Sequence, residues 1–289
     1  RAWQALGADV ALIPEDDVPG RLGTDYYFGA WYDPRGGSLN PLAYARGLAE
    51  AARDAGADIH ERSPALNIDR DAMKWRVTTS SGVLIADAVL CCTNAYNHAI
   101  PEMRGAVIPL RTAQVASAPL AEAHARTILP RGESASDTQR LLTSFRLTAD
   151  NRLIMGGASA TAGDGNARLL KHLHRAAQRR FPDLDSLSWQ YGWSGYLALT
   201  QDHLPRIFNV ADGFHAGIGC NGRGIAMATV VGVELARIVR GVQDCDVPVH
   251  KVRRVFGFSL RHPGVAATVF FKRTLDSMER RLSRRPGTT

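Results

Sequence analysis

The chain has 289 residues, of which 45% are hydrophobic and 22% charged, with a formal net charge of +7. These values are ordinary for a globular protein and exclude a disordered or fibrous chain. No apolar run approaches the ~18 residues that a membrane span needs, so we expect no transmembrane segment and take the cytoplasm as the location. The basic residues gather in segment 251–289 without a nucleic-acid-binding motif or an aromatic platform, so we expect no nucleic-acid partner.

A capped helix is predicted at residues 41–55. Asn40 can cap its start, Pro41 suits its first position and Gly56 can end it. The apolar positions repeat with helical spacing, so we expect one side of the helix to face a core. That side is formed by Leu42, Ala45, Leu48, Ala49 and Ala52.

After this helix the sequence predicts a hairpin with a buried parallel strand, and then a separate antiparallel layer. Residues 73–90 predict a β-hairpin that leads into the apolar run 88–92, which is typical of a parallel strand buried on both faces. Between residues 109 and 192 the apolar and polar residues indicate a separate antiparallel layer with a covering helix. Its strands are expected at 110–118, 140–147 and 151–157, and its helix at 166–181.

The segment 213–227 is the most informative part of the chain. It places five glycines in a strand-like run that passes directly into a helical pattern at 223–240. Glycine permits close approach and positive φ, and a helix start offers free N–H groups with a partial positive charge. The segment therefore predicts a backbone that contacts an electron-rich ligand, with a plain strand-to-helix connection as the alternative.

Four segments in the same order resemble the D-amino acid oxidase family of flavoproteins. Besides 213–227, they are the Gly-x-x-x-Pro signature ending at Pro41 with the helix and strand after it, segment 82–96, and the Trp-x-Gly and Thr-x-Asp-x-x-Pro pattern in 193–205. The resemblance implies an α/β (α+β) protein in which a Rossmann-type FAD-binding domain is interleaved with an antiparallel-sheet substrate domain. The expected parts are 1–108 (partial FAD-binding domain), 109–192 (substrate-binding sheet with covering helix), 193–250 (return to the FAD-binding domain) and 251–289 (basic C-terminal helical tail).

The family's N-terminal Gly-x-Gly-x-x-Gly turn, which holds the FAD pyrophosphate, has no counterpart here. We therefore expect the chain to be a C-terminal fragment of its parent enzyme and to be inactive by itself. No Ser-His-Asp or paired-carboxylate constellation is evident, and amine oxidation by a flavin needs none, so no catalytic residue is assigned.

The resemblance implies contacts with FAD and with an amine substrate. The cofactor-binding residues would be Leu66 near the adenine, Thr93 near the ribose and pyrophosphate, Gly195, and Gly219, Cys220, Asn221, Gly222, Arg223, Gly224 and Ile225 against the flavin ring. The candidates for the substrate pocket are Trp193, Tyr196, Leu197, His203 and Arg223. Gly195 stands where monomeric sarcosine oxidases carry the cysteine that bonds the flavin, so we expect FAD to be held without a covalent bond. We expect no metal.

Two positions narrow the substrate that the resemblance implies. Leu197 stands where glycine oxidase and D-amino acid oxidase carry an arginine for the substrate carboxylate, and Ala226 where sarcosine oxidases carry a lysine. The chain most resembles the γ-glutamylputrescine oxidase branch, which implies a small-molecule amine on a longer chain. It would be oxidised at its C–N bond by hydride transfer to flavin N5, with hydrolysis of the imine and O₂ or another acceptor reoxidising the flavin. The alternatives are a D-amino acid or sarcosine-type dehydrogenase that passes electrons to a quinone or partner, and a non-catalytic flavoprotein subunit.

Overall fold

The computed structural model describes residues 2–97, 100–158, 166–184, 187–242 and 244–283, and it divides into two units. Unit 1 contains Arg1–Leu39, Arg111–Gly195 and Pro263–Thr289, and unit 2 contains Asn40–Leu110 and Tyr196–His262. The changes of unit near residues 110 and 195 lie close to the boundaries expected at 109 and 193. Residues 1–39 group with the segment expected to form the antiparallel layer.

A five-stranded sheet of order β11-β7-β10-β9-β8 dominates unit 1. Its strands are β7 (Ile108–Pro119), β8 (Ser134–Ser136), β9 (Thr143–Leu147), β10 (Arg152–Ala158) and β11 (Trp189–Leu199), of which β7 and β11 run on into unit 2. Helix α5 (Asn166–Arg180) packs on one face, where Leu173 joins Phe145 and Met155 in the core. The predicted antiparallel layer and its covering helix are confirmed.

Short elements complete unit 1. Strands β1 (Ala11–Pro14) and β2 (Gly29–Tyr32) form a separate antiparallel pair. The remaining helices are α1 (Ala2–Ala5), a 3₁₀ turn at Glu15–Asp17, α2 (Val18–Leu22), α4 (Glu122–Ala125) and α7 (Arg261–Ser283). The first two residues of α7 and the 3₁₀ turn before it at Phe258–Leu260 belong to unit 2.

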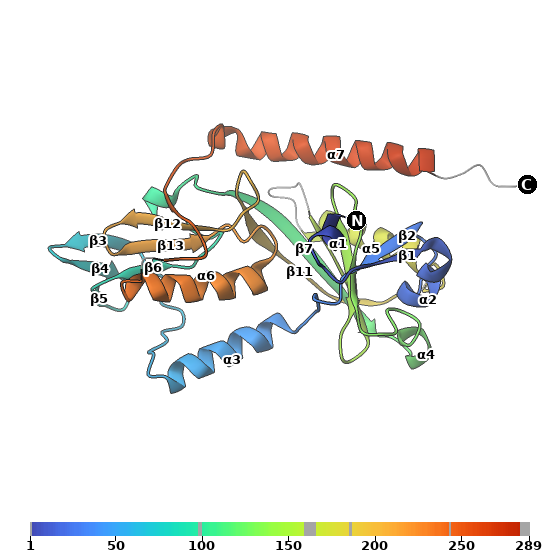
Figure 1. Cartoon of the computed structure of the whole chain (residues 1–289), viewed down its shortest axis with the longest axis horizontal. Helices are drawn as coiled ribbons and strands as arrows, with labels where there is room; N and C mark the ends of the chain where they lie inside the picture. Colours follow the sequence, from blue (N-terminus) through green and yellow to red (C-terminus); the bar gives the residue numbers. More distant parts are fainter. Residues whose placement is uncertain (1, 98–99, 159–165, 185–186, 243, 284–289) are drawn as a thin grey trace, which may run out of the picture. The chain divides into compact units, whose positions relative to one another are not determined.

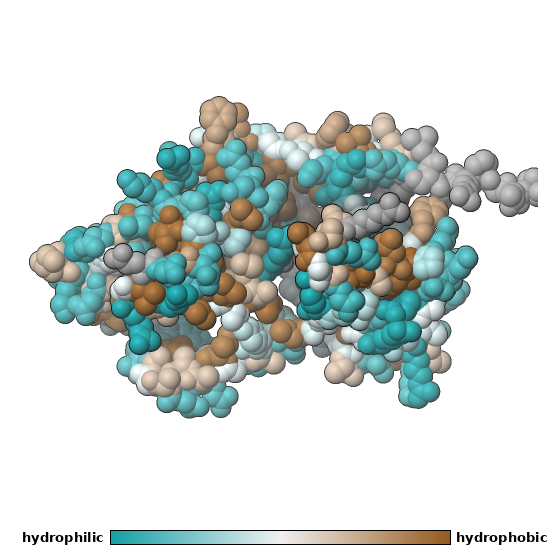
Figure 2. Space-filling model, viewed as in Figure 1, coloured by the Kyte–Doolittle hydropathy of each residue, from teal (hydrophilic) through white to brown (hydrophobic). Residues whose placement is uncertain are grey.

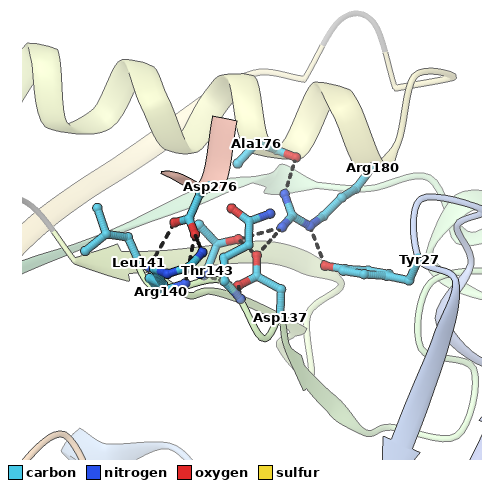
Figure 3. A network of polar contacts seen from close by, with 9 residues as sticks. Tyr27, Asp137, Arg140, Leu141, Thr143, Ala176, Arg180 and Asp276 are labelled. Atoms are coloured by element: carbon cyan, nitrogen blue, oxygen red, sulfur yellow. Dashed lines mark hydrogen bonds and ion pairs between the residues drawn. The ribbon is translucent and has the colours of Figure 1, made fainter. Parts of the chain in front are cut away.

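A buried ion pair ties α5 to the sheet of unit 1 (Figure 3). The Arg180 guanidinium lies 2.6 Å from Asp137, and the two side chains are only 1% and 3% exposed. Arg180 also donates to the Tyr27 hydroxyl, to Thr143 Oγ1 and to the Ala176 carbonyl. Asp137 in turn accepts the N–H and the hydroxyl of Thr143. Every charged atom of the pair therefore has a partner, which a buried charge requires.

Helix α7 is joined to the same unit through a buried carboxylate. Asp276 is 4% exposed and accepts the backbone N–H groups of Arg140 and Leu141 as well as the Arg140 side chain (Figure 3). On its other side the helix exposes hydrophobic residues, as Figure 2 shows, with Phe270 and Phe271 75% and 62% exposed. The predicted basic C-terminal helix is thus present as far as Ser283, and residues 284–289 lie outside the described residues.

Unit 2 contains a mixed sheet of order β14-β12-β13-β6 with a helix along it (Figure 1). The strands are β6 (Val89–Cys91), β12 (Arg206–Ala211), β13 (Phe214–Ile218) and β14 (Val249–Lys251), and the helix is α6 (Gly224–Val239). A Cβ on Gly217 would lie 2.3 Å from Val231 Cγ1 of α6, so the glycine lets the helix approach the strand.

The other elements of unit 2 include the predicted hairpin and the capped helix. Strands β3 (Asn67–Asp71), β4 (Lys74–Thr78) and β5 (Val83–Ala86) form an antiparallel sheet, and a 3₁₀ turn spans Pro101–Met103. In α3 (Pro41–Asp54) the Asn40 Oδ1 accepts the N–H groups of Leu42 and Ala43 at 3.1 Å, as the capping pattern predicts.

Two burial predictions for unit 2 are wrong. The side of α3 expected to face a core is open, because no element of the described chain covers it: Leu42 and Leu48 are 57% and 51% exposed, Ala45 is exposed, and Ala49 and Ala52 are half-buried. The 88–92 strand was expected to be buried on both faces. β6 lies instead at the edge of its sheet, so Cys91 is buried while Leu90 is 39% exposed.

Among the described helices, none combines the length and the apolar character that a membrane span needs.

Candidate functional site

The candidate site lies where two parallel strands end side by side in unit 2. β6 and β13 pair in parallel, with Cys91 opposite Ala216. Their carboxyl ends share one edge of the sheet, which is where open α/β sheets bind ligands. Thr93 and Asn94 follow β6 at this edge, and the glycine-rich turn follows β13.

Glycine is required in this turn for two different reasons. Gly219 and Gly222 have φ values of +82° and +86°, which L side chains rarely adopt. A Cβ on Gly219 would also lie 2.5 Å from Thr200 Cγ2, so packing excludes a side chain there. At Gly222 the nearest atom to such a Cβ is Leu197 Cδ1 at 3.5 Å, which is an ordinary contact. The backbone conformation alone therefore selects glycine at position 222.

Polar side chains from three separate segments hold the turn. The Asn94 Oδ1 accepts the Gly219 N–H at 3.1 Å. The Asn221 carboxamide accepts the Thr200 N–H at 2.9 Å, donates to Thr200 Oγ1 at 3.0 Å and donates to the Gly219 carbonyl. Asn94 and Asn221 have φ values of +50° and +51°, which asparagine tolerates better than most residues. The protein's own hydrogen bonds thus fix the shape of the turn.

Four N–H groups at the end of the turn are left for another acceptor. Arg223 caps α6 without a side-chain hydrogen bond, and its carbonyl accepts the Met227 N–H. Within the part of the chain that the structure describes, the N–H groups of Gly222, Gly224, Ile225 and Ala226 have no acceptor. An uncapped helix start of this kind attracts electron-rich groups. The geometry fits the contact with a flavin ring that the sequence predicts.

Several candidate pocket residues lie around this turn. Leu197, near the end of β11, lies beside Gly222, because its Cδ1 would be 3.5 Å from a Cβ at that position. The neighbouring Tyr196 N–H donates to the Tyr96 hydroxyl at 3.0 Å, and the two rings meet edge-on at 6.0 Å. Arg223 is exposed at the start of α6. His203 is exposed in the loop after Thr200, where its φ is +59°.

Other candidates lie farther from the turn along the chain or in unit 1. Thr93 is exposed at the end of β6, beside Asn94, with its hydroxyl 3.2 Å from Cys91 Sγ. Leu66 precedes β3, is 59% exposed and donates its N–H to the Thr78 carbonyl. Trp193 and Gly195 lie on β11 in the part assigned to unit 1, where Trp193 is 43% exposed. The roles of these residues stay predictions.

The cysteine of the turn is a buried thiol. Cys220 is 8% exposed, and burial raises its pKa, which favours the protonated and unreactive form. All four cysteines of the chain are free, as their spacing indicated. His215, which precedes the turn on β13, has its pKa lowered by burial, while the nearby Asp212 acts in the opposite direction.

Sequence reasoning missed three residues that shape the site, namely Asn94, Tyr96 and Thr200. Each belongs to a segment that the resemblance had singled out, but none was given a role. The signal for Asn94 was present, because a polar residue tolerant of positive φ directly follows an apolar parallel strand. The Tyr96 and Thr200 contacts join segments 100 and 21 residues apart, so no local pattern predicts them.

Comparison with known proteins identifies the family of the chain. Residues 1–238 match the family model described as FAD dependent oxidoreductase (DAO). The chain is 31% identical over 225 residues to a probable oxidoreductase OrdL of Haemophilus influenzae, covering 76% of this chain and 51% of that protein. It is 28% identical to the γ-glutamylputrescine oxidoreductase of Escherichia coli, covering 83% of this chain and 57% of that protein. The chain thus spans about half the length of the curated relatives that it matches.

The fold is also that of known flavoenzymes. The glycine oxidase of Geobacillus kaustophilus superposes with a TM-score of 0.74 at 21% identity, covering 88% of this chain and 70% of that structure. The mixed α/β fold with antiparallel sheets is thereby confirmed. The chain belongs to the DAO family of FAD-dependent oxidoreductases, as the resemblance to D-amino acid oxidase predicted.

Proposed function

We propose that the protein containing this chain is an FAD-dependent oxidoreductase that oxidises the C–N bond of an amine carried on a longer chain. The observation that carries the proposal is the set of four unpartnered N–H groups, from Gly222, Gly224, Ile225 and Ala226, found in the described chain at the carboxyl edge of parallel strands. When bound, FAD accepts the hydride from the carbon beside the amine nitrogen. The chain's own residues supply donors to the ring and position the amine.

The proposed donors would act by electrostatics. Backbone N–H groups at a helix start carry partial positive charge, so they stabilise an electron-rich ring edge. Leu197 Cδ1 would lie 3.5 Å from a Cβ at position 222, so the apolar side chain of Leu197 borders the turn. An apolar lining favours the neutral amine over the ammonium form, and the neutral amine is the form that can be oxidised.

The proposed substrate class follows from the absence of a cationic side chain at positions 197 and 226 beside the turn. A buried carboxylate needs a cationic partner. Leu197 and Ala226 offer none at the positions where, by the resemblance, glycine oxidases and sarcosine oxidases carry one. A small α-amino acid is therefore disfavoured unless Arg223 or a residue elsewhere in the protein supplies the charge. The similarity to a γ-glutamylputrescine oxidoreductase supports an amine of that kind. Putrescine catabolism and a cytoplasmic location stay predictions.

The proposed function is tested by reduction of the flavin in the whole protein under anaerobic conditions. γ-Glutamylputrescine should bleach the oxidised flavin faster than putrescine, sarcosine or D-alanine does. Bleaching by none of these amines would contradict the proposal and favour the non-catalytic subunit. Bleaching by sarcosine or D-alanine alone would favour the amino-acid dehydrogenase.

A second candidate, the D-amino acid or sarcosine-type dehydrogenase, differs in its substrate and also in its electron acceptor. The exposed Phe270, Phe271 and Met278 on the basic helix α7 would suit the docking of an acceptor protein in a dehydrogenase. Reoxidation of the reduced protein by O₂ distinguishes the two. Fast reoxidation in air supports an oxidase, whereas slow reoxidation in air and fast reoxidation by a quinone supports the dehydrogenase.

The flavin should be released by acid. Cys220 is the cysteine of the turn, and burial raises its pKa, so its thiol is a poor nucleophile for bonding the ring. Gly195 offers no thiol at the attachment position that the resemblance indicates. Precipitation with trichloroacetic acid should therefore leave the yellow colour in the supernatant. A yellow pellet would show that a residue of the protein is bonded to the flavin.

Replacement of Leu197 by Arg should shift the preference toward small amino acids. A guanidinium at position 197, beside Gly222, would add a carboxylate partner on β11 to the exposed Arg223 of the turn, and a charged hydrogen bond contributes about 1.5–3 kcal/mol. We expect kcat/KM for sarcosine or glycine to rise about tenfold relative to γ-glutamylputrescine. Leu197→Met is the matched control, because it keeps volume without charge. An unchanged ratio in Leu197→Arg would contradict the assignment of this position to the pocket.

A further inference from the structure

A cavity of about 240 Å³ lies inside unit 1, between α5, α7 and the start of β9. Helix α5 turns one face toward it, because its lining residues have the i, i+3, i+4, i+7 spacing of a single helix face. This α5–α7 cavity shares no lining residue with the glycine-rich turn or with the pocket candidates around that turn. Its charged and titratable lining residues are His172, Arg175, Arg179 and Arg180 of α5 and Arg273 and Asp276 of α7.

The buried side of this cavity is formed by charges that already have partners. Arg180 pairs with Asp137 (Figure 3). The Asp276 carboxylate accepts the side chain and the backbone N–H of Arg140 and the backbone N–H of Leu141. Asp276 is the one carboxylate among the lining residues that the structure describes. The described lining therefore has no carboxylate left for the other cations of the cavity.

Two exposed arginines of the cavity have no counter-ion in the described chain. Within that part of the chain, Arg175 and Arg273 form neither an ion pair nor a side-chain hydrogen bond. They come from different helices and border the same cavity. Arg179 borders it as well, four residues after Arg175, and like charges at that spacing on a helix repel each other. The repulsion around the cavity thus favours an anion from outside the described chain.

The positions of these two arginines are not explained by their own helices. A cation in the last turn of a helix is stabilised by the helix dipole, which accounts for Arg179 and Arg180 at the end of α5. Arg175 precedes the last turn of α5, and Arg273 lies in the middle of α7. Neither of them gains from a dipole, so the feature that they share is the cavity.

A phosphate group matches these cations in charge, shape and size. The planar guanidinium fork donates paired hydrogen bonds to phosphate and carboxylate oxygens. Two arginines favour an anion with more than one charge, and a phosphate monoester carries about −1.5 to −2 at neutral pH. The cavity of about 240 Å³ is smaller than the roughly 300–1,000 Å³ that is typical of pockets for drug-sized ligands. It therefore admits a small anion rather than a whole coenzyme.

We propose that the α5–α7 cavity binds a phosphate group, either inorganic phosphate or the phosphate of a small molecule, with Arg175 and Arg273 as its charged ligands. The bound group neutralises both cations and joins the two helices across the cavity. A ligand that binds only the folded state stabilises that state, so phosphate also raises the temperature at which the unit unfolds. The inference goes beyond the proposed function and does not depend on it, because no residue of the cavity belongs to the glycine-rich turn.

Calorimetric titration of the FAD-loaded whole protein tests the proposal, with inorganic phosphate and glycerol 3-phosphate as ligands and with ionic strength held constant by sodium chloride. Arg175→Gln and Arg273→Gln should each raise the Kd of the tighter ligand about tenfold or more, as expected for loss of a charged hydrogen bond. Arg175→Lys keeps the charge without the fork, so its Kd should lie between those of wild type and Arg175→Gln. Arg131→Gln is the control and should leave the Kd unchanged, because Arg131 is an exposed arginine of unit 1 that does not line the cavity.

Thermal unfolding separates phosphate binding from a structural role of the arginine. Without phosphate, Arg175→Gln should unfold at the wild-type temperature or slightly above it, because the substitution removes repulsion with Arg179. At a phosphate concentration tenfold above the wild-type Kd, the Tm of wild type should rise by about 3–6 °C and that of Arg175→Gln by less than half as much. Equal stabilisation of the two proteins by phosphate would overturn the proposal.

The two soluble ligands also identify the source of the phosphate group. Tighter binding of glycerol 3-phosphate indicates a phosphorylated small molecule, and tighter binding of inorganic phosphate indicates the free anion. Equal Kd values in wild type and in both glutamine variants would overturn the proposal, as would the absence of saturable binding of either ligand to wild type. Binding to vesicles that contain phosphatidic acid, without binding to either soluble ligand, would overturn it too and assign these arginines to a membrane surface.

Discussion

Replacing Asp137 by Ala is expected to lower the free energy of unfolding by about 3–5 kcal/mol, as removal of one partner from a buried ion pair does. The loss is large because Arg180, 1% exposed, would keep its charge in the protein interior without a counter-ion. Thr143 would also lose its carboxylate acceptor for both N–H and hydroxyl. Chemical denaturation of the whole protein, followed by fluorescence, measures the change.

Two controls separate this effect from a general loss of charge. Asp33→Ala removes an aspartate, 26% exposed, that pairs with the exposed Arg35, and it should leave the denaturation midpoint nearly unchanged. The double variant Asp137→Ala/Arg180→Met removes both charges, so it should recover part of the stability lost in the single variant. A double variant less stable than Asp137→Ala would show that the aliphatic and hydrogen-bonding contacts of Arg180, rather than its unpaired charge, dominate.

Replacing Gly222 by Val should weaken FAD binding by about tenfold or more. Gly222 has a φ of +86°, and a β-branched residue in that region is strained by about 1–3 kcal/mol. Relief of the strain would rotate the backbone and turn the N–H groups of Gly222 and Gly224 away from their present directions. The flavin content of purified protein and the Kd for FAD of the apoprotein both report the effect.

The matched control for this prediction is Gly232→Val in the middle of α6. A Cβ on Gly232 would meet no heavy atom within 4 Å, and the residue has no positive φ, so the same substitution is accommodated there. Full flavin content in Gly222→Val protein would contradict the assignment of the turn to FAD. Loss of flavin in Gly232→Val protein would indicate that a valine anywhere in this region disturbs α6. Loss of flavin in Gly222→Val protein could then not be attributed to the turn.

The local signals in the sequence predicted most of the elements. The Asn40 cap, the hairpin before β6 and the glycine run before α6 depend on contacts within a few residues, and all are present. Burial was predicted less well. The expectation for α3 assumed that an apolar side always has a partner, whereas Leu42 and Leu48 are exposed in the described chain.

In the candidate site, too, the sequence predicted features that depend on neighbouring residues and missed those that depend on distant contacts. The positive φ values of the turn follow from its glycines, so the sequence located it correctly. The residues that hold it, Asn94 and Thr200, lie 125 and 19 residues before Gly219 along the chain, and their contacts exist only after the strands pair.

The bonds from Asn94 and Asn221 to the turn have a further consequence for affinity. Ordering a flexible residue costs about 1–2 kcal/mol of conformational entropy at room temperature. Since the carboxamides already fix the backbone around Gly219, that cost is met during folding and does not recur when a ligand arrives. If the turn binds its ligand as proposed, it acts as a preformed receptor rather than as a loop that closes on the ligand. Its affinity would then depend in part on side chains that do not touch the ligand.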